Sequence, residues 1–268
     1  MTTHWSGVPG RHHLDHENVI DRRKHEILGV GIDCFTRDEA IAYIDRCLKS
    51  GHLLCVCFAN AHTLNMASTT TQVREALRRF LVLNDGIGID IASKLKYGIA
   101  FPDNLNGTDF VPAFLARTQH RLRLYLVGST DAVAEQAANS FQHRFPRHRI
   151  IGWRNGFFRN PNEIHRTCRD IRAAQADCVL VGMGNPLQEL WIANHAMETG
   201  ARLLIGVGAL FDFEAGRVVR APRWVRNIRC EWAYRLLLEP NRLARRYLIG
   251  NVAFLSKAVV DSWNHRRG

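Results

Sequence analysis

The chain has 268 residues, enough for one large α/β domain or for one domain with an appendage. Its 46% apolar and 23% charged residues exclude a disordered chain, and no apolar run is long enough for a membrane-spanning helix. The net charge of +11 favours anionic partners such as nucleic acid, acidic lipid or phosphorylated substrates.

The N-terminal segment is polar and shows no hydrophobic periodicity, so we predict that residues 1–26 form a flexible tail. It lacks the apolar segment of a signal peptide, and the seven scattered cysteines include no CxxC pair. Both features indicate a cytoplasmic protein with reduced thiols. The histidines form no HExxH pattern, so the sequence predicts neither a metal site nor a cofactor.

Residues 27–219 alternate between short apolar runs and amphipathic segments. Strands that are apolar throughout and separated by helices are typical of a parallel sheet with both faces covered. We therefore predict an α/β domain with a mostly parallel sheet between two layers of helices. The predicted strands are 53–60, 80–85, 122–129, 149–153, 177–184 and 202–208. The predicted helices include 37–50, 68–80, 130–145 and 185–200.

The last segment, residues 220–268, shows no strand pattern. Apolar residues spaced by four from Trp224 to Leu236 mark one face of a helix, and Pro240 interrupts that helix and can begin a second one. Residues 220–248 hold eight arginines, no lysine and two glutamates, between four large aromatic residues. We predict that 220–268 form a basic helical appendage on the α/β domain.

Polar and glycine-rich segments follow most of the predicted strands, where ligands bind in open α/β sheets. One of them is VGMGNPLQE, residues 181–189. Its glycines would let a ligand approach the backbone, and Asn185 and Pro186 would begin a helix whose free N–H groups face a diphosphate. A tight turn with a capping glutamate explains the segment equally well. The candidate substrate-binding residues here are Gly182, Gly184, Asn185, Pro186, Gln188 and Glu189.

The segment LNDGIGID, residues 83–90, places Asp85 beside two glycines at the end of a predicted strand. A carboxylate there can act as a general base, although a simple Asp-Gly turn accounts for the pattern as well. Other strand ends supply amides and carboxylates that suit a sugar or cap a helix. The further candidate substrate-binding residues are Asn60, Asn84, Asn106, Gly107, Asp109, Gly128, Gly208 and Asp212.

Taken in order, these segments resemble the WecG/TagA/CpsF family of bacterial glycosyltransferases, glycosyltransferase family 26. The resemblance covers about residues 28–250, and its last three segments are the most specific. The matching segments are ANAHTLNMA, LNDGIGID, LNGTDF, YLVGS, GWRNGFF, VGMGNPLQELWI, GVGALFDFEAGRVVRAPRWV and EWAYRLLLEPNRLARRYL.

The resemblance implies an inverting, metal-independent enzyme that moves a hexose or N-acetylhexosamine-type sugar from a UDP-sugar to a polyprenyl-diphosphate-linked saccharide acceptor. Such enzymes have a Rossmann-like α/β domain with a C-terminal appendage. They build exopolysaccharide or cell-wall polymers and attach peripherally to the inner face of the cytoplasmic membrane. The family's general base corresponds to Asp85, and its Gln-Glu pair to Gln188 and Glu189. The oligomeric state, a homo-oligomer included, is left open.

Three features distinguish this sequence from many members of that family. Ala59 stands where many have threonine, no arginine closely precedes Gly107, and Arg229-Cys230 replaces a Gly-Leu pair. The first two fall at the usual sugar contacts. The resemblance therefore leaves open whether the donor carries the N-acetylmannosamine-type sugar of the best-known members.

The arginines of the appendage agree with this chemistry, because a departing UDP is a diphosphate whose charge must be met without a metal. The sequence has no DxD triplet of the kind that holds a metal in other transferases. Arginine and large aromatic residues also favour an anionic membrane surface, although a solvated basic helix would have the same composition. The arginines expected to bind acceptor or membrane are Arg220, Arg226, Arg235, Arg242, Arg245 and Arg246.

Three other functions were weighed against this one. A nucleic-acid-binding protein would share the positive charge, but no helix-turn-helix, RNP or zinc pattern supports it, so no nucleic-acid partner is expected. A nicotinamide-dependent oxidoreductase needs a GxGxxG segment, which the sequence lacks. A non-catalytic sensor would bind a UDP-sugar without turning it over.

Overall fold

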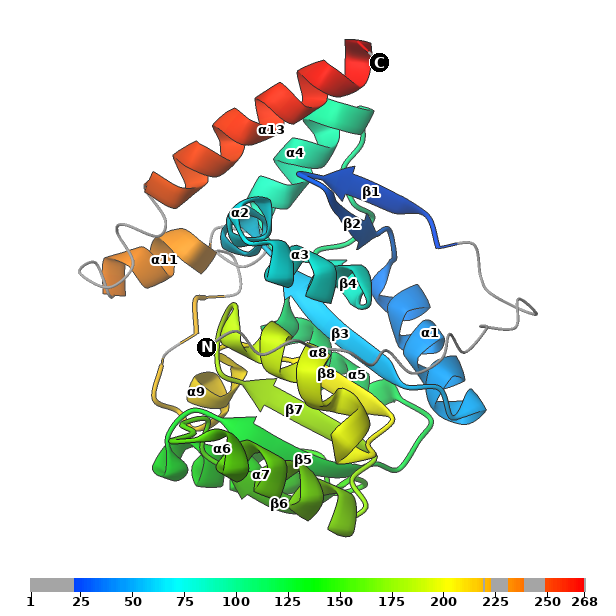
Figure 1. Ribbon diagram of the computed structural model, residues 1–268, viewed down its shortest axis with the longest axis vertical. Coiled ribbons are helices and arrows are strands. Elements are labelled where there is room, and N and C mark those ends of the chain that lie inside the picture. Colours follow the sequence, from blue (N-terminus) through cyan, green and yellow to red (C-terminus); the bar gives the residue numbers. More distant parts are fainter. Residues whose placement is uncertain (1–21, 219, 223–230, 239–248, 268) are drawn as a thin grey trace, which may run out of the picture.

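A six-stranded parallel sheet forms the centre of the protein (Figure 1). The computed structural model describes residues 22–218, 220–222, 231–238 and 249–267. The strand order is β4-β3-β8-β7-β5-β6, which confirms the predicted α/β fold and all six predicted strands. The strands are β3 (Leu54–Ala59), β4 (Leu81–Asn84), β5 (Arg123–Gly128), β6 (Arg149–Arg154), β7 (Cys178–Gly182) and β8 (Leu203–Gly206).

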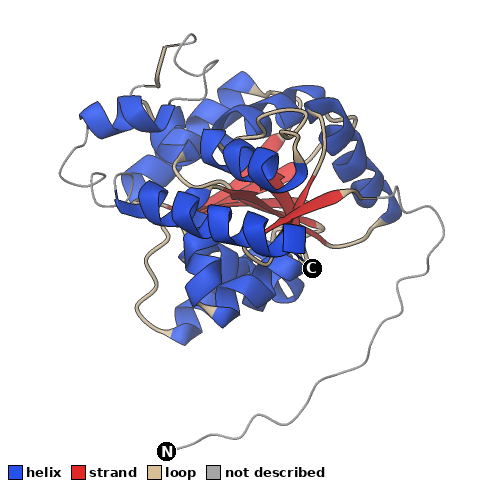
Figure 2. Cartoon of the chain, turned by 90° about the horizontal axis from the view of Figure 1, so that it is seen from above, coloured by secondary structure: helices blue, strands red, loops and turns tan. Residues whose placement is uncertain are grey.

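Helices cover both faces of this sheet (Figure 2). One apolar cluster joins the sheet to α1 (Arg37–Ser50), α5 (Gly107–Arg117), α6 (Asp131–Arg144) and α9 (Leu210–Glu214). A second cluster joins the opposite face to α2 (Ala61–Thr69), α3 (Thr71–Arg78), α4 (Ile87–Tyr97), α7 (Pro161–Ala173), α8 (Leu187–Thr199) and α13 (Gly250–Arg267).

The alternation of side chains along each strand supplies both clusters. In β3, Val56 and Phe58 belong to the first cluster, whereas Cys57 and Ala59 belong to the second. Successive side chains of a strand point to opposite faces, so a strand that is apolar at every position is buried on both sides. This is why the uninterrupted apolar runs predicted the sheet.

The helix α1 matches its predicted bounds because both of its ends carry clear signals. Thr36 and Glu39 form a reciprocal capping box at its start, and Gly51 ends it in the left-handed conformation. The predicted helix 68–80 differs, since Thr70 separates two helices, α2 and α3.

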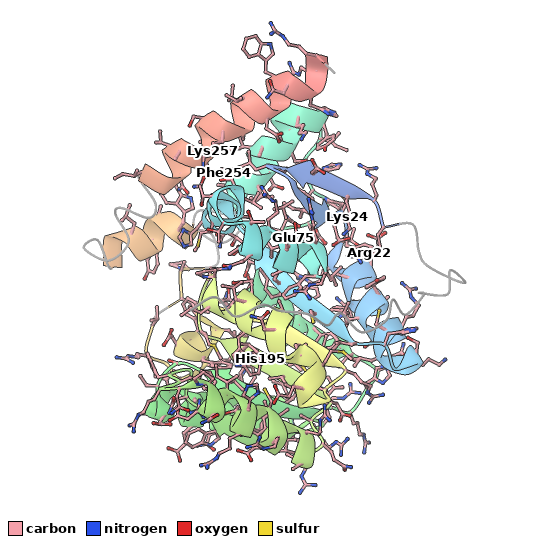
Figure 3. All side chains as sticks on the ribbon, viewed as in Figure 1. Arg22, Lys24, Glu75, His195, Phe254 and Lys257 are labelled. Carbon is pink, nitrogen blue, oxygen red and sulfur yellow. The ribbon has the colours of Figure 1, made fainter. Side chains whose placement is uncertain are left out.

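A two-stranded hairpin, β1 (Lys24–Ile27) and β2 (Val30–Asp33), precedes the sheet. Residues 24–26 therefore belong to a strand, whereas the sequence placed them in the tail. The buried Asp33 carboxylate accepts hydrogen bonds from Arg22 (2.7 and 2.8 Å) and from the Val82 N–H of β4 (3.0 Å) (Figure 3). This buried contact ties the hairpin to the sheet. Each hairpin strand has four residues, and together they bring only Ile27, Val30 and Ile32 into the core, too few for a periodic pattern to stand out.

The described part of the appendage consists of residues 220–222, α11 (Glu231–Leu238) and α13. The predicted helix starts at Trp224 and Pro240 lie outside the described residues. Helix α13 packs on α4 and α2, where Phe254 is fully buried and Lys257 Nζ donates to Ser68 Oγ at 2.9 Å (Figure 3). Within the described residues, no helix has both the length and the apolar character needed to cross a membrane.

Candidate active site

The strand register aligns the polar segments that follow the strands. Ala59 pairs with Asn84, Gly128 with Gly182, and Val181 with Gly206. Strands β3, β4, β5, β7 and β8 therefore end along one margin of the sheet, which we call the carboxyl edge (Figure 1). Ligands of open α/β sheets bind outside such an edge.

Asp85 lies at this edge, directly after β4. Its N–H donates to the Ala59 carbonyl at 2.9 Å, and its Oδ2 accepts a hydrogen bond from Asn60 Nδ2 at 3.3 Å. Asn60 is the N-cap of α2, because its Oδ1 accepts from the N–H groups of His62 and Thr63. Capping fixes the orientation of the Asn60 amide, and this orientation points its NH₂ group at the Asp85 carboxylate.

A hydrogen-bond network continues from Asn60 toward β7 and β8. Thr63 Oγ1 donates to Asn60 Oδ1 at 3.3 Å and accepts from Asn185 Nδ2 at 3.2 Å. Asn185 Nδ2 also donates to Glu189 Oε1 at 2.8 Å. The segments after β4, β3 and β7 are thus connected through side chains rather than through sheet hydrogen bonds alone.

Gln188 and Glu189 complete this network beneath the surface. Gln188 Nε2 donates to Glu189 Oε1 at 2.8 Å, and Gln188 Oε1 accepts from the N–H groups of Gly184 (3.2 Å) and Gly208 (3.0 Å). Gln188 is 3% exposed and Glu189 is 0% exposed. Burial raises the pKa of the Glu189 carboxyl to about 7, so this group titrates near neutral pH.

A loop before α5 docks on the end of β4. The buried Asn84 donates from Nδ2 to the Asp103 carbonyl at 2.8 Å, and Asn104 Oδ1 accepts from the Gly86 N–H at 2.9 Å. Asn106 then caps α5 by accepting from the Asp109 N–H at 3.0 Å. These contacts place the start of α5 beside Asp85.

Arg220 joins the appendage to the same helix start. Its Nη2 donates to Asp109 Oδ1 at 2.8 Å and to Thr108 Oγ1 at 3.1 Å, while its guanidinium lies 5.5 Å from the centre of the Phe213 ring. One guanidinium is thereby held where the α/β domain meets the appendage.

Comparison with known proteins identifies the family of the chain. The profile of the Glycosyl transferase WecG/TagA/CpsF family matches residues 25–268. The chain belongs to this family of glycosyltransferases. Two similar proteins come from Staphylococcus aureus, strains MRSA252 and NCTC 8325 / PS 47. Each is 29% identical over 235 residues, which is 85% of this chain and 90% of the relative. Both are named N-acetylglucosaminyldiphosphoundecaprenol N-acetyl-beta-D-mannosaminyltransferase.

The start of α8 in this glycosyltransferase differs from the sequence expectation. Helix α8 begins at Leu187, and no side chain caps it, so Asn185 binds Thr63 and Glu189 instead of the helix start. The N–H of Gly184, a glycine expected to let a ligand approach the backbone, donates to Gln188 Oε1. The predicted residues of this segment do lie together at the carboxyl edge. Gln188 and Glu189, however, are buried and bind the loops after β7 and β8.

Several predicted glycines owe their identity to packing between protein segments. A Cβ on Gly128 would lie 2.4 Å from the Gly182 carbonyl oxygen, and one on Gly107 would lie 2.7 Å from the Phe58 ring. Gly184 and Gly208 have positive φ values of 78° and 55° and no atoms crowding a Cβ position. Gly184 and Gly208 are partly exposed at the carboxyl edge, whereas Gly107 and Gly128 are buried.

Of the remaining positions singled out in the sequence, the structure describes the side chains of some and not of others. Asp212 in α9 accepts a hydrogen bond from Ser129 Oγ at 3.4 Å, next to the end of β5, and Ala59 is fully buried in the sheet. Ala59 is the last residue of β3, and its side chain packs in the apolar core. The side chain of Arg235 and all of Arg226, Arg242, Arg245 and Arg246 lie outside the described residues.

Thr63 and Thr108 belong to polar segments that follow predicted strands, and both contribute to the edge. Thr63 stands three residues after the N-cap Asn60, the spacing of a capping box. Asn104, which accepts from the Gly86 N–H, is the contributor that the sequence did not indicate. Its contact joins two segments that meet only in the fold, and no local pattern marks it.

Proposed function

We propose that this glycosyltransferase moves a hexose or N-acetylhexosamine-type sugar from a UDP-sugar to a polyprenyl-diphosphate-linked saccharide, with inversion and without a metal ion. The acceptor class is supported by the name of the S. aureus relatives, which describes a sugar linked to undecaprenol through a diphosphate. The donor class is supported by the diphosphate chemistry of the arginine-rich appendage. The product would enter cell-wall polymer or exopolysaccharide synthesis.

The observation that carries the mechanism is the position of Asp85 at the carboxyl edge, with its Oδ2 bound by Asn60. In an inverting displacement the acceptor hydroxyl oxygen attacks C1 of the donor sugar. The hydroxyl proton passes to the Asp85 carboxylate as the new C–O bond forms. The bond between C1 and the UDP oxygen breaks at the same time, and its electron pair leaves with the diphosphate. The hydrogen bond from Asn60 keeps the carboxylate oriented for this proton transfer.

Arg220 is our candidate for a cationic group beside the leaving diphosphate. Its guanidinium is fixed by Asp109, Thr108 and Phe213 at the edge, so little rearrangement is needed to meet an anion there. Arg226, Arg242, Arg245 and Arg246 would meet the acceptor diphosphate or anionic lipid, and Arg235 would do so or stabilise the helix. Attachment would then be peripheral, at the inner face of the cytoplasmic membrane.

A donor screen tests this function. Purified protein is incubated with different UDP-sugars and a short-chain polyprenyl-diphosphate-linked N-acetylglucosamine, and mass spectrometry detects a product heavier by one sugar residue. We expect a product with at least one UDP-sugar. If UDP-sugars bind but no acceptor is extended, the protein is a sugar-nucleotide sensor and the proposal is wrong.

A further inference from the structure

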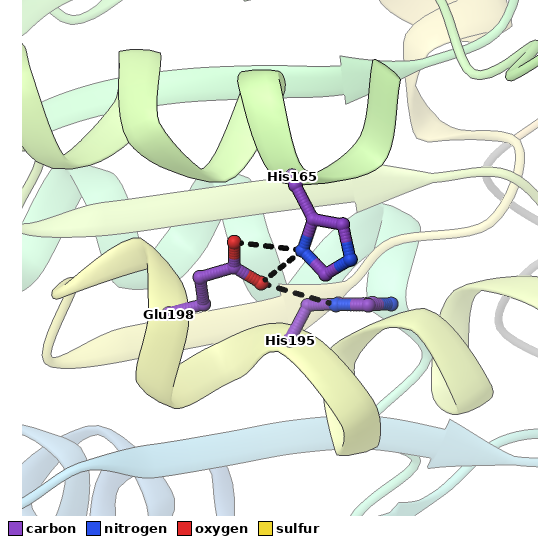
Figure 4. A group of neighbouring side chains, drawn as sticks. All are labelled: His165, His195 and Glu198. Carbon is purple, nitrogen blue, oxygen red and sulfur yellow. Dashed lines mark hydrogen bonds and ion pairs between the residues drawn. The ribbon is translucent and has the colours of Figure 1, made fainter. Parts of the chain in front are cut away.

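Two histidines and a glutamate meet between α7 and α8, away from the carboxyl edge (Figure 4). His165 comes from α7, whereas His195 and Glu198 lie one turn apart on α8. Glu198 carboxylate oxygens lie 2.9 and 3.0 Å from His165 Nδ1 and 3.5 Å from His195 Nδ1. One ligand atom from each of the three residues falls within 4.8 Å of the other two.

The two helices hold this cluster in place. The rings of Phe158 and Trp191 stack at 6.4 Å, and the Trp191 ring lies 5.8 Å from His195. Arg172 Nη2 of α7 donates to the Met197 carbonyl of α8 at 2.8 Å. The Phe158–Trp191 and Arg172–Met197 contacts lie outside the cluster and join its two sides, which limits the cost of arranging the three residues around an ion.

We propose that His165, His195 and Glu198 bind a divalent transition-metal ion, with Zn²⁺ as the best fit. Two imidazoles and one carboxylate are a recurrent zinc ligand set that leaves one position for water. Bonds of about 2.1 Å place neighbouring ligand atoms of a tetrahedral zinc ion about 3.4 Å apart. The observed separations straddle this value, so small side-chain shifts suffice. The His165 side chain is 49% exposed, which gives an ion and its water access from solvent.

This site is separate from the proposed transfer chemistry. Asn185 and Glu189 serve the carboxyl edge at the start of α8, whereas His195 and Glu198 occupy its last turns. The ion would bridge α7 to α8 and stabilise the fold without taking part in transfer. It also departs from the sequence expectation of no metal site, because ligands on two different helices form no short motif.

Zinc binding by the full-length protein tests the proposal. The protein is stripped with a chelator, dialysed against Zn²⁺, and its bound zinc is measured beside that of the double variant His165→Ala, His195→Ala. We expect the native protein to hold one more zinc ion than the variant. Because the histidines near the N-terminus can bind zinc as well, the difference is the quantity that counts. Zn²⁺ at about 100 times its Kd should raise the native Tm by roughly 5–10 °C.

Two further variants keep the test decisive if the double variant folds poorly. Glu198→Gln preserves shape but removes the anionic ligand, and we expect its zinc affinity to fall at least about tenfold. His143→Ala removes an exposed histidine of α6 and should bind zinc like the native protein. Cobalt(II) substitution should give the visible absorption of a tetrahedral ion in the native protein and in His143→Ala, but not in the double variant. Equal zinc content and equal Tm shifts in native protein and Glu198→Gln would overturn the proposal.

Discussion

The two ends of helix α8 carry polar clusters of opposite character. At its start, Gln188 and Glu189 are buried and bound by amides and backbone N–H groups of the loops after β7 and β8. In its last turns, His195 and Glu198 are partly exposed, and Glu198 contacts His165 of α7. A buried network that joins several strand ends can orient groups for chemistry. A partly exposed cluster between two helices is better suited to stabilise the packing of those helices. The two ends of α8 therefore differ in the role we assign to them: the buried start supports sugar transfer, and the last turns support the stability of the fold.

The largest expected effect comes from removing the charge at Asp85. Asp85→Asn keeps the size of the side chain but cannot accept the acceptor proton, so turnover should fall roughly 10²–10⁴-fold. UDP affinity, measured by calorimetry, should stay close to that of the native enzyme. Asp131→Asn, which alters an exposed carboxylate after β5, is the matched control and should retain turnover. Near-native turnover in Asp85→Asn would remove this residue from the mechanism.

The second prediction concerns arginines of the C-terminal appendage, which belong to neither cluster of α8. Each basic residue near an anionic leaflet contributes about 1 kcal/mol, so changing Arg242, Arg245 and Arg246 to Ala should weaken liposome partitioning roughly 100-fold. The loss should grow as salt is lowered, because screening then weakens the native attraction less. Co-sedimentation with anionic vesicles measures it, and the triple Lys variant should bind almost normally. If the triple Ala variant sediments like the native protein, these arginines do not bind the membrane.

A third prediction uses the buried carboxyl at the start of α8. The pKa of Glu189 is about 7 in the folded protein against 4.5 as its ordinary value, so between these pH values the folded state binds a proton that the unfolded state has released. Stability should therefore fall as pH rises through this window. Glu189→Gln mimics the protonated form and lacks this loss. From pH 4.5 to above 7, Glu189→Gln should gain about 3 kcal/mol in unfolding free energy relative to native protein. Denaturant unfolding at several pH values checks it; parallel curves would contradict it.

The smallest effect is expected at Arg220, which contributes one charged contact at the edge. Arg220→Ala should lower turnover with a soluble short-chain acceptor roughly tenfold, the scale of a hydrogen bond to a charged group. Arg220→Lys keeps the charge but loses the planar set of guanidinium donors, so its turnover should lie between those of the native enzyme and Arg220→Ala. Steady-state kinetics would show this, and unchanged kcat and KM in Arg220→Ala would limit the residue to packing.

The sheet could be predicted from sequence because its information is local. Apolar runs mark β3 to β8, and the capping box at Thr36 with Gly51 marks both ends of α1. The β1–β2 hairpin could not be recognised, since it depends on the contact between Asp33 and the Val82 N–H across 49 residues. Its stability comes from tertiary contacts, which leave no periodic pattern.

The candidate site was predictable in position but not in detail. Asp85, Asn60 and Asn185 follow predicted strands, so the rule that parallel strands end at one edge places them together. The sequence did not show which candidate side chains are buried, because the burial of Gln188 and Glu189 depends on their hydrogen bonds to loops after two different strands. The contact of Arg220 with Asp109 spans 111 residues, and the histidine cluster joins two helices. Such contacts depend on how helices pack, which a single sequence does not specify.

The measurement that tests the account most directly is sugar transfer and thermal stability in the same chelated sample. If transfer occurs at the carboxyl edge without a metal while zinc ties α7 to α8, EDTA should lower Tm but leave kcat unchanged at temperatures well below the transition. In Glu198→Gln, which binds zinc more weakly, EDTA should lower Tm less than in the native protein and should leave kcat unchanged. If EDTA abolishes transfer and Mg²⁺ or Mn²⁺ restores it, the leaving diphosphate depends on a metal ion and the central claim is wrong.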